Sequence, residues 1–381
     1  MENSMKRLGI YVIYDVEGAA DPYIEPVLKE IKRHLTHLIV VCNFPEIRKG
    51  REYLEKYADE ILCRDNQGYD AGAYKDTLLS LSAAGVLEDY EELLLANDTF
   101  YGPLYPFCEM FQRMEQEACD FWGITRHPGN TEGIADFPHI QSYFLVFKRK
   151  LLHSREFFDF WDQLQYPENH LDAIRFFELG INRYLNCKGY CAKSYMECMN
   201  PRLSPEPGEN PYGMHSFELI RDMRIPVIKR KALSFDNTGF SNALRAFEYI
   251  DKDLDYDVGF IKDHVRRIHR YPVGEASFDY EELEAFYQSH ERVYIYGNGI
   301  WGKNLNAYFR YKGWNLAGHF VTCPKKNENC LNFLETEISE TNGIIIAVGT
   351  SSVIKEISRI VLQKCRKEQV LSPRTCNQKG T

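Results

Sequence analysis

The chain has 381 residues, of which 44% are hydrophobic and 27% are charged. This length is enough for two domains with proper cores, and the composition is that of a folded globular protein rather than a disordered one. The formal net charge of −9 at pH 7 argues against a general nucleic-acid binder, because phosphate contacts need a concentrated basic surface that the sequence does not show. We therefore expect no nucleic-acid partner.

The cysteine pattern indicates a reducing compartment. The chain has 11 cysteines and no CxxC pair, and an odd number at wide spacing favours neither a disulfide framework nor a zinc site. No signal-peptide core follows the amino terminus, and no apolar run approaches the roughly 18 residues that span a bilayer. We expect a cytoplasmic protein, working in the cytosol or at the inner face of the membrane, with any membrane association peripheral.

Strands and helices alternate from the start of the chain. The pattern predicts strands at 8–14, 35–44 and 60–64, separated by helices at 26–34 and 46–57. Such alternation is typical of a parallel sheet with helices on its faces. The opening of the chain is therefore predicted to be Rossmann-like.

A glycine-bearing turn follows the third strand. It carries Asn66, Gly68, Asp70 and Gly72 and leads into a helix predicted at 73–84. Glycines and a carboxylate at a helix start can bring backbone N–H groups and the helix dipole close to an anionic or polar ligand. The same residues could also form just a tight turn with an Asx cap.

The most informative segment runs from Leu93 to Pro103, LLLANDTFYGP. Its apolar run predicts a buried strand, which places Asn97 and Asp98 where that strand surfaces at its carboxyl end. In open α/β sheets this edge binds ligands, and a hard oxygen ligand such as Asp98 suits a divalent cation that holds a diphosphate. The alternative is an ordinary strand-to-turn junction in which both side chains only bond local backbone.

The middle of the chain offers candidates for the acceptor side of such a site. The alternation of Gln141, Tyr143, Leu145 and Phe147 suggests a strand with one face buried and one face lining a site. Helices are predicted at 154–164 and 173–185.

Glu178 is expected on the polar side of the second of these helices, where it could act as general base or be only a solvated carboxylate. Asp172 is a weaker candidate for the same role. His139, His170 and His215 lie in or beside the predicted site loops, and one of them could complete a metal site, although each also fits a surface or packing role.

A second strand, glycine-rich turn and helix begin near residue 291. Gly297, Gly299 and Gly302 match the full GxGxxG pattern in the setting that dinucleotide binding requires. The acid that should follow the next strand is missing, because that strand ends in Thr322 and Cys323. This loop is therefore either a dinucleotide site or part of a structural or regulatory Rossmann-like module.

Four segments together resemble the rhamnan synthesis protein F family: RDNQGYDAGAYKDTL, EELLLANDTFYGPL, DFWGIT and HIQSYFLVFKR. The similarity covers roughly residues 5–270 and is carried mostly by NQGYD, NDTFYGP and QSYF. The resemblance implies a glycosyltransferase with a GT-A type fold that uses a nucleotide sugar in cell-wall or surface-polysaccharide assembly, with rhamnose as one candidate sugar.

The resemblance also implies roles for individual residues. Asn66, Gly68 and Asp70 would border the donor nucleotide, and Asn97-Asp98 would take the place of a metal-binding DXD element. Gln141, Ser142 and Tyr143 would line the acceptor side. The chain departs from the DXD pattern by offering a single carboxylate at Asp98, and cations of this kind prefer several charged oxygens.

We therefore predict an α/β protein with a GT-A type, Rossmann-like mixed-sheet domain at 1–270, a linker at 271–290 and a small Rossmann-like domain at 291–381. The predicted activity is that of a nucleotide-sugar-dependent hexosyltransferase acting on a glycan or lipid-linked glycan. Mg²⁺ or Mn²⁺ would bind at Asp98, with His215 as a second ligand, and the donor base would lie near Tyr14.

Two other functions remain open. A protein that binds nucleotide sugars or glycans without catalysis would fit Asn97 and the lack of a clear catalytic base. A dehydrogenase using the carboxy-terminal glycine loop would need the ribose-binding acid that is missing. The sequence leaves the sugar, the stereochemical outcome and the oligomeric state open.

Overall fold

The computed structural model describes residues 5–130, 137–200, 205–268, 276–324 and 329–375. The chain divides into two compact units. The first unit comprises Met1–Arg230 with Tyr249–Tyr256, and the second comprises Lys231–Glu248 with Asp257–Thr381. Each unit is described by itself.

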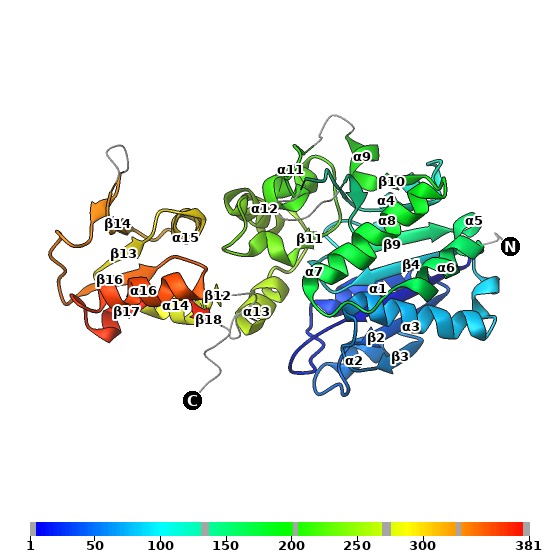
Figure 1. Cartoon of the computed structure of the whole chain (residues 1–381), viewed down its shortest axis with the longest axis horizontal. Coiled ribbons are helices and arrows are strands. Elements are labelled where there is room, and N and C mark those ends of the chain that lie inside the picture. The colour runs from blue at the N-terminus through cyan, green and yellow to red at the C-terminus, as the bar shows by residue number, and fades with distance from the viewer. Residues whose placement is uncertain (1–4, 131–136, 201–204, 269–275, 325–328, 376–381) are drawn as a thin grey trace. The chain divides into compact units, whose positions relative to one another are not determined.

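The first unit is built on a seven-stranded sheet with the strand order β10-β6-β9-β4-β1-β2-β3 (Figure 1). Strand β9 runs antiparallel to its neighbours β4 and β6, and the other neighbouring pairs are parallel. The strands are β1 (Arg7–Ile13), β2 (His37–Cys42), β3 (Glu60–Cys63), β4 (Glu92–Asn97), β6 (Phe121–Gly123), β9 (Phe144–Lys148) and β10 (Ala192–Ser194).

The strand order creates a switch point between β1 and β4. The chain runs outward from β1 through β2 to β3 and then returns to the other side of β1 to form β4. Open α/β sheets bind ligands outside the carboxyl ends of their strands at such a point. The residues that follow β1 and β4 are therefore the first place to look for a site.

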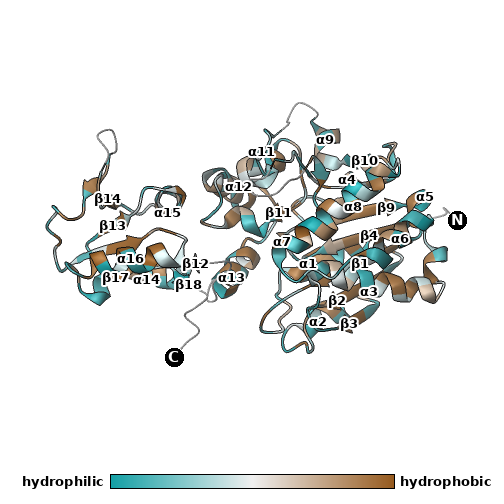
Figure 2. Cartoon of the chain, viewed as in Figure 1, coloured by the Kyte–Doolittle hydropathy of each residue, from teal (hydrophilic) through white to brown (hydrophobic). Residues whose placement is uncertain are grey.

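The central strands form because their sequences are apolar almost throughout. Every residue of β1 and β4 is buried, as expected for parallel strands that are covered on both faces. Figure 2 shows β4 and β9 as largely hydrophobic ribbons, whereas the helices mix hydrophobic and hydrophilic residues along their length.

Helices cover both faces of the sheet. On one face α3 (Tyr69–Ala83), α6 (Arg155–Gln163) and α8 (Leu179–Cys187) share a buried cluster with β1, β4 and β9, in which Tyr74 and Trp161 are large members. On the other face, Phe107 and Phe111 of α4 (Phe107–Glu115) lie against Phe144 of β9. Helix α1 (Ile24–Lys32) lies beside α4, because Glu30 accepts a hydrogen bond from the Phe107 N–H at 2.8 Å.

Shorter elements complete the first unit. Two-residue strands form the antiparallel pairs β5 (Phe100–Tyr101) with β11 (Ile228–Lys229), and β7 (Arg126–His127) with β8 (His139–Ile140). The remaining helical elements are α2 (Arg51–Glu55), η1 (Val86–Asp89), α5 (Arg149–Leu152), α7 (His170–Asp172), the π-helix η2 (Ala173–Glu178), α9 (Tyr195–Met199), α10 (Pro211–Met214) and α11 (Ser216–Arg221).

The second unit contains a five-stranded sheet with the order β15-β14-β13-β16-β17, parallel throughout. Its strands are β13 (Arg292–Tyr296), β14 (Leu316–Val321), β15 (Leu331–Asn332), β16 (Asn342–Ile346) and β17 (Val370–Leu371). The accompanying elements are α13 (Gly259–Ile268), β12 (Ala276–Ser277), α14 (Tyr280–Gln288), α15 (Ile300–Tyr311), α16 (Ser351–Val361), η4 (Lys367–Gln369) and β18 (Arg374–Thr375). Two further elements, η3 (Arg230–Leu233) and α12 (Phe240–Asp253), contain residues of both units.

The fold class predicted from the sequence is confirmed: a Rossmann-like mixed sheet is followed by a smaller Rossmann-like sheet. The predicted linker at 271–290 contains α14, which begins where the Asp279 carboxylate accepts hydrogen bonds from two backbone N–H groups and which buries Leu283. Residues 269–275 lie outside the described part, and the predicted domain limits stay a prediction. Among the described helices, none has the length and apolar character that crossing a bilayer requires.

Candidate functional site

The switch point of the first unit holds Asp98. The backbone N–H of Asp98 donates to the Val12 carbonyl of β1 at 3.1 Å, and Asp98 Oδ2 accepts from the Tyr14 N–H at 3.4 Å. These two contacts fix the end of β4 against the end of β1. Asp98 is only 6% exposed, so its carboxylate lies in a largely dry environment.

The glycine-bearing turn meets the end of β4. Asn97 Nδ2 donates to Asp70 Oδ2 at 2.8 Å, and Asp70 Oδ1 accepts from the Ala71 N–H in the first turn of α3. A Cβ on Gly72 would stand 2.2 Å from the Gln67 carbonyl oxygen, so the turn closes only because this residue is glycine. The two segments singled out in the sequence are therefore brought together.

A polar network holds the turn in place from β2 and β3. Asn43 Nδ2 donates to the Tyr69 carbonyl at 2.9 Å, and Arg64 donates to Asn43 Oδ1 at 2.7 Å and to the Gln67 carbonyl at 2.9 Å. Gly68 begins α3 with φ of 76°, a conformation in which glycine is favoured. The turn is thus preorganised at the carboxyl edge of the parallel strands.

Two cations that sequence reasoning missed face this edge. Strand β11 pairs with β5 immediately after the NDT segment, and this pairing brings in Lys229 and Arg230. Lys229 Nζ donates to Thr99 Oγ1 at 2.7 Å, and Arg230 Nη1 lies 3.5 Å from Asp98 Oδ2. A basic KRK run directly after the apolar IPVI segment was the available signal in the sequence.

Burial shapes the electrostatics of these groups. It lowers the pKa of Lys229 to about 8, against the opposing influence of Glu178. Burial also raises the pKa of Asp98, which the Arg230 guanidinium counteracts, and raises the pKa of Asp70, which the hydrogen bond from Asn97 counteracts. The edge therefore combines the buried Asp98 with the half-buried Asp70, Lys229 and Arg230, whose charges depend on one another.

Glu178 lies in a hydrogen-bond network rather than on a solvated helix face. Its Oε2 accepts from both the N–H and the hydroxyl of Ser142 at 2.7 Å, and Oε1 lies 3.3 Å from His139 Nε2. Burial disfavours its charge, but the His139 and Ser142 contacts outweigh this and lower the pKa of Glu178 to about 2. A carboxylate with so low a pKa stays ionised at neutral pH and is a weak base.

The other residues expected on the acceptor side are engaged inside the protein. Gln141 accepts from Thr125 Oγ1 at 2.7 Å, and the Tyr143 hydroxyl lies 2.9 Å from the same oxygen and 3.2 Å from the Tyr212 hydroxyl. The expected alternation of buried and site-facing residues is not observed, because every residue from 139 to 147 is buried. Ser142 touches Glu178, and the Tyr143 ring lies beneath Lys229 Nζ at 4.2 Å.

The described residues do not offer a good set of metal ligands. No group of three or more His, Cys, Asp or Glu side chains in the described ranges is arranged to hold a metal ion. Asp98 Oδ2 already faces an N–H donor and the Arg230 guanidinium, and neither can supply an electron pair to a cation. His215 lies 3.5 Å from Glu209 and shares no described contact with Asp98.

Asp172 and His170 lie in α7, away from the described contacts of the site. The Asp172 carboxylate accepts a hydrogen bond from Asn169 Nδ2 at 2.7 Å, and its backbone N–H donates back to Asn169 Oδ1. This reciprocal pair begins the short helix. The arrangement gives Asp172 a local structural role.

In the second unit the three glycines of the GxGxxG segment are explained in part by packing. A Cβ on Gly302 would lie 2.2 Å from the Gly297 carbonyl oxygen, and a Cβ on Gly297 would lie 2.8 Å from the Ala347 oxygen. Gly299 has open space around it. Thr322, where a ribose-binding acid was sought, bonds the Tyr296 hydroxyl at 2.7 Å.

Buried polar atoms without a described partner gather in the first unit. They include the hydroxyls of Tyr11 and Tyr74 and the Oδ1 of Asn66. The charge of Asp98 acts on both tyrosines, and Asp70 acts on Tyr74. Each of these atoms lacks the hydrogen bond that a buried polar group normally makes.

The family model of "Rhamnan synthesis protein F" matches residues 38–293 of the chain. The chain belongs to this family. The match begins within β2 and includes the NQGYD turn, the NDT segment and the Lys229–Arg230 pair. The resemblance expected from the sequence is thereby confirmed.

Curated relatives match only part of the protein. The uncharacterized protein y4gN of Sinorhizobium fredii is 24% identical over 186 residues, which are 48% of this chain and 46% of the relative. The virulence protein VirA of Vibrio anguillarum is 30% identical over 138 residues, which are 35% of this chain and 41% of the relative. The chain thus spans less than half the length of these relatives.

Solved structures show weak overall similarity. A 4-diphosphocytidyl-2C-methyl-D-erythritol synthase superposes with a TM-score of 0.33 at 15% identity, covering 50% of this chain and 90% of that one. A putative nucleotide-diphospho-sugar transferase from Desulfovibrio desulfuricans G20 gives a TM-score of 0.29 at 12% identity, covering 49% and 78%. We draw no conclusion about activity from likenesses at this level.

Proposed function

We propose that this protein is a glycosyltransferase of GT-A type that takes a sugar from a nucleotide-diphosphate donor and transfers it to a glycan or lipid-linked glycan. The observation that carries the proposal is the hydrogen bond between Asn97 and Asp70, which joins the glycine-bearing turn to the end of β4 at the switch point of the sheet. Membership of a family named for rhamnan synthesis supports rhamnose as the first sugar to test.

The donor would lie across the carboxyl ends of β1 and β4. Tyr14 is 48% exposed beside Asp98 and can present its ring to the base. Asn66 lies in the glycine-bearing turn, and its side-chain amide is the candidate to bond the ribose or base. This position follows the general rule for ligands of open α/β sheets.

Lys229 and Arg230 would face the diphosphate. Lys229 Nζ has one described hydrogen bond, to Thr99, and the described side-chain hydrogen bonds of Arg230 use only its Nη1. Both side chains therefore keep donors for phosphate oxygens. Binding of Mg²⁺ or Mn²⁺ at Asp98 with His215 stays a prediction, and the described side chains around Asp98 do not fit it. We therefore propose that Lys229 and Arg230 stabilise the negative charge of the departing nucleoside diphosphate.

Asp70 is the better candidate for accepting the proton of the acceptor hydroxyl. Its pKa is raised by burial, and a base poised nearer to neutral pH is more effective than one that is always ionised and well solvated by hydrogen bonds. Glu178, with its pKa of about 2, suits a different role, as a fixed acceptor that orients Ser142 and His139 towards the sugar. Asp172 as an alternative base stays a prediction.

A panel of nucleoside diphosphates and nucleotide sugars, titrated calorimetrically into the full chain with and without Mn²⁺, tests the proposal. We expect saturable binding that Asp98→Ala and Arg230→Ala each weaken. The matched control Arg155→Ala removes an exposed arginine on α6 and should have no effect. Absence of binding to every compound, or equal binding in the native protein and both site variants, would contradict the proposal.

A non-catalytic protein that binds nucleotide sugars or glycans is the second candidate. The low pKa of Glu178 and the single carboxylate at Asp98 favour it, because both weaken the case for chemistry. Slow release of free sugar from a bound nucleotide sugar distinguishes the two functions. An active transferase shows this release and loses it in Asp70→Asn, whereas a binding protein retains its ligand intact.

A further inference from the structure

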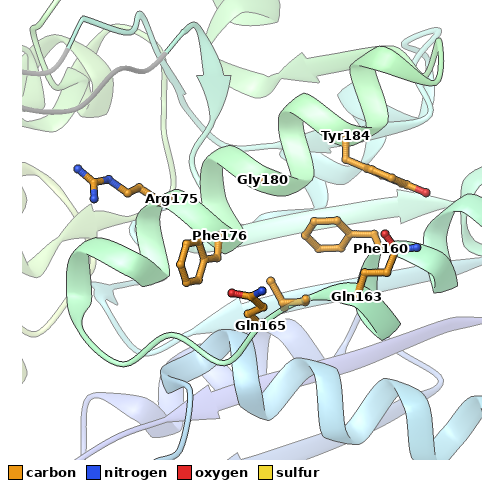
Figure 3. A pocket seen from close by; sticks show the side chains of 8 residues that line it. Phe160, Gln163, Gln165, Arg175, Phe176, Gly180 and Tyr184 are labelled. Carbon is orange, nitrogen blue, oxygen red and sulfur yellow. The ribbon is translucent and has the colours of Figure 1, made fainter.

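A groove lined by aromatic rings lies on the helical layer of the first unit. Phe160, Phe176 and Tyr184 supply its rings, and Gly180 lies between the last two in sequence. Figure 3 shows the row running from Arg175 and Phe176 through Phe160 to Tyr184. The groove has a volume of about 290 Å³, near the lower end of the roughly 300–1,000 Å³ found for small-molecule sites.

Polar side chains along the groove keep their hydrogen-bonding groups available. Gln163, Gln165 and Arg175 line it together with the rings, and no hydrogen bond or ion pair of these three side chains occurs among the described contacts. Phe176 leaves 36% of its surface exposed, although a ring of this size gains by burial. Rings beside free amide and guanidinium groups are what a sugar needs, because its C–H face packs on an aromatic ring while its hydroxyls bond polar tips.

The π-helix η2 connects this groove to the candidate site. Arg175 and Phe176 of η2 line the groove, whereas Glu178 at the end of the same element bonds Ser142 in the site. π-helical turns inside helices are often found at functional sites. Here the π-helical turn carries Arg175 and Phe176 to the groove and Glu178 to the candidate site.

A second connection runs through the loop after α6. Gln165 lines the groove, and the neighbouring Tyr166 ring lies against the glycine-bearing turn, where a Cβ on Gly68 would come within 2.6 Å of it. The Tyr166 hydroxyl also donates to Asp76 of α3 at 2.5 Å. The wall of the groove and the wall of the candidate site thus share one short segment.

We infer that this groove binds a neutral sugar unit of the acceptor glycan, at a distance along the glycan from the unit that receives the new sugar. The inference rests on the proposed transferase function and adds to it a second binding position outside the donor site. Arg175 is the only charged residue among those that line the groove, and Figure 3 shows its guanidinium extending away from the rings, so the surface under the sugar is neutral. The volume fits one ring rather than a whole nucleotide sugar.

The test uses the full chain and short neutral oligosaccharides, α-linked rhamnosides among them, followed by saturation-transfer NMR and calorimetry. We expect one oligosaccharide to bind, and we expect Phe176→Ala to weaken it by about tenfold or more through loss of the stacking surface. The matched control is Leu171→Ala, which truncates a residue of similar exposure, 37% against 36%, in α7 outside the groove. This control should bind like the native protein.

Gly180→Ala separates loss of binding from loss of folding. The added methyl group would meet the Arg175 oxygen at 3.4 Å and the Phe160 ring at 3.7 Å, which are ordinary contacts, so it reduces the groove without a clash. Alanine inside a helix is favoured over glycine by roughly up to 1 kcal/mol. We therefore expect a variant that is at least as stable as the native protein and binds the oligosaccharide more weakly.

The outcomes distinguish this inference from the proposed function. Oligosaccharide binding that is unchanged in Phe176→Ala, displacement of the sugar by inorganic phosphate, or no binding of any oligosaccharide by the native protein would overturn the groove assignment. Nucleoside diphosphate binding is measured on the same samples and should be equal in native, Phe176→Ala and Gly180→Ala proteins. If the native protein bound the oligosaccharide but no nucleotide, the groove would still be a sugar-binding site, and the proposed transferase function would be refuted.

Discussion

Lys229 carries a positive charge at the candidate site, and its pKa is closer to neutral pH than that of an ordinary lysine. Burial lowers its pKa to about 8, so the proposed diphosphate contact should fade as the pH rises through that value. We predict that nucleoside diphosphate binding weakens steadily between about pH 7 and pH 9, because the neutral amine no longer attracts phosphate. Calorimetric titrations across this range check the result.

Lys229→Arg provides the sharpest comparison, because a guanidinium stays charged throughout the same range. Binding by this variant should be independent of pH where the native protein loses affinity, while Lys150→Met, on the exposed α5, should follow the native curve. A native protein whose binding does not change around pH 8 would contradict the role given to Lys229.

The free energy of unfolding should change with pH in the opposite direction. The cost of burying the Lys229 charge is present below about pH 8 and is relieved as the pH rises towards the pKa of lysine in the unfolded chain.

Glu178 should control stability in acid. Its folded pKa of about 2 lies below the ordinary value, so its contribution is present above the unfolded pKa and is lost as the pH falls towards 2. The shift corresponds to something on the order of 3 kcal/mol. We predict that Glu178→Gln lowers the free energy of unfolding by about this amount at pH 7 and flattens its dependence on pH between about 4.5 and 2.

Chemical unfolding at a series of pH values measures the effect. Asp172→Asn is the matched control, because that carboxylate bonds only Asn169 among its described partners and lies outside the network of Ser142 and His139. Equal acid sensitivity of the native protein and Glu178→Gln would show that the His139 contact does not stabilise the charged carboxylate.

At the scale of elements, two glycines in helices of the same unit should respond in opposite ways to alanine. In α3 a Cβ on Gly72 would stand 2.2 Å from the Gln67 oxygen, whereas in α8 a Cβ on Gly180 would keep 3.4 Å from its nearest atom. We predict that Gly72→Ala costs roughly 1–3 kcal/mol and loosens the turn that carries Asp70. Gly180→Ala should be neutral or stabilising.

Urea unfolding followed by far-ultraviolet circular dichroism compares the two variants. Gly72→Ala should also weaken nucleoside diphosphate binding, since the Asn97–Asp70 hydrogen bond depends on the turn. Equal effects of the two substitutions on the free energy of unfolding would contradict the prediction that a Cβ at position 72 clashes with the Gln67 oxygen.

Local patterns in the sequence predicted the parallel strands and the turn, because continuous apolar runs and glycine-bearing punctuation are properties of neighbouring residues. They did not predict Lys229 and Arg230 at the site, because these residues arrive through a pairing with β5 that spans more than half of the first unit. For Glu178, helical periodicity indicates only a polar side of the helix, and the contacts with Ser142 and His139 on that side are seen only in the tertiary structure. Its catalytic role stays a prediction.

The regular helix expected over 173–185 begins instead as a π-helix. Its sequence, AIRFFE, contains no proline or glycine that would mark the change. The π-helix contains Arg175 and Phe176, which line the groove, and Glu178, which lies in the candidate site. Positions where local preference and structure disagree are often functional, and this one lies between the two proposed binding positions.

At the scale of the whole molecule, each unit has a hydrophobic core of its own. Buried residues of β1 and β4 with α3, α6 and α8 form one cluster, and those of β13 and β16 with α15 belong to another. The candidate donor site belongs entirely to the first unit, and the GxGxxG loop belongs to the second. A substitution or ligand that affects one unit should therefore change hydrogen exchange in that unit and leave exchange in the other unit unchanged.

Hydrogen exchange followed by mass spectrometry on the full chain tests this division. A nucleoside diphosphate should slow exchange at the ends of β1 and β4 and in the turn before α3, and should leave β13 and α15 unchanged. Gly302→Ala forces a Cβ to 2.2 Å from the Gly297 oxygen and should speed exchange in β13 and α15 instead. A bound ligand slows hydrogen exchange of the backbone that it contacts. If the nucleotide slowed exchange mainly in the loop at Gly297, the nucleotide site would lie in the second unit, and the proposed role of Asp98 would be refuted.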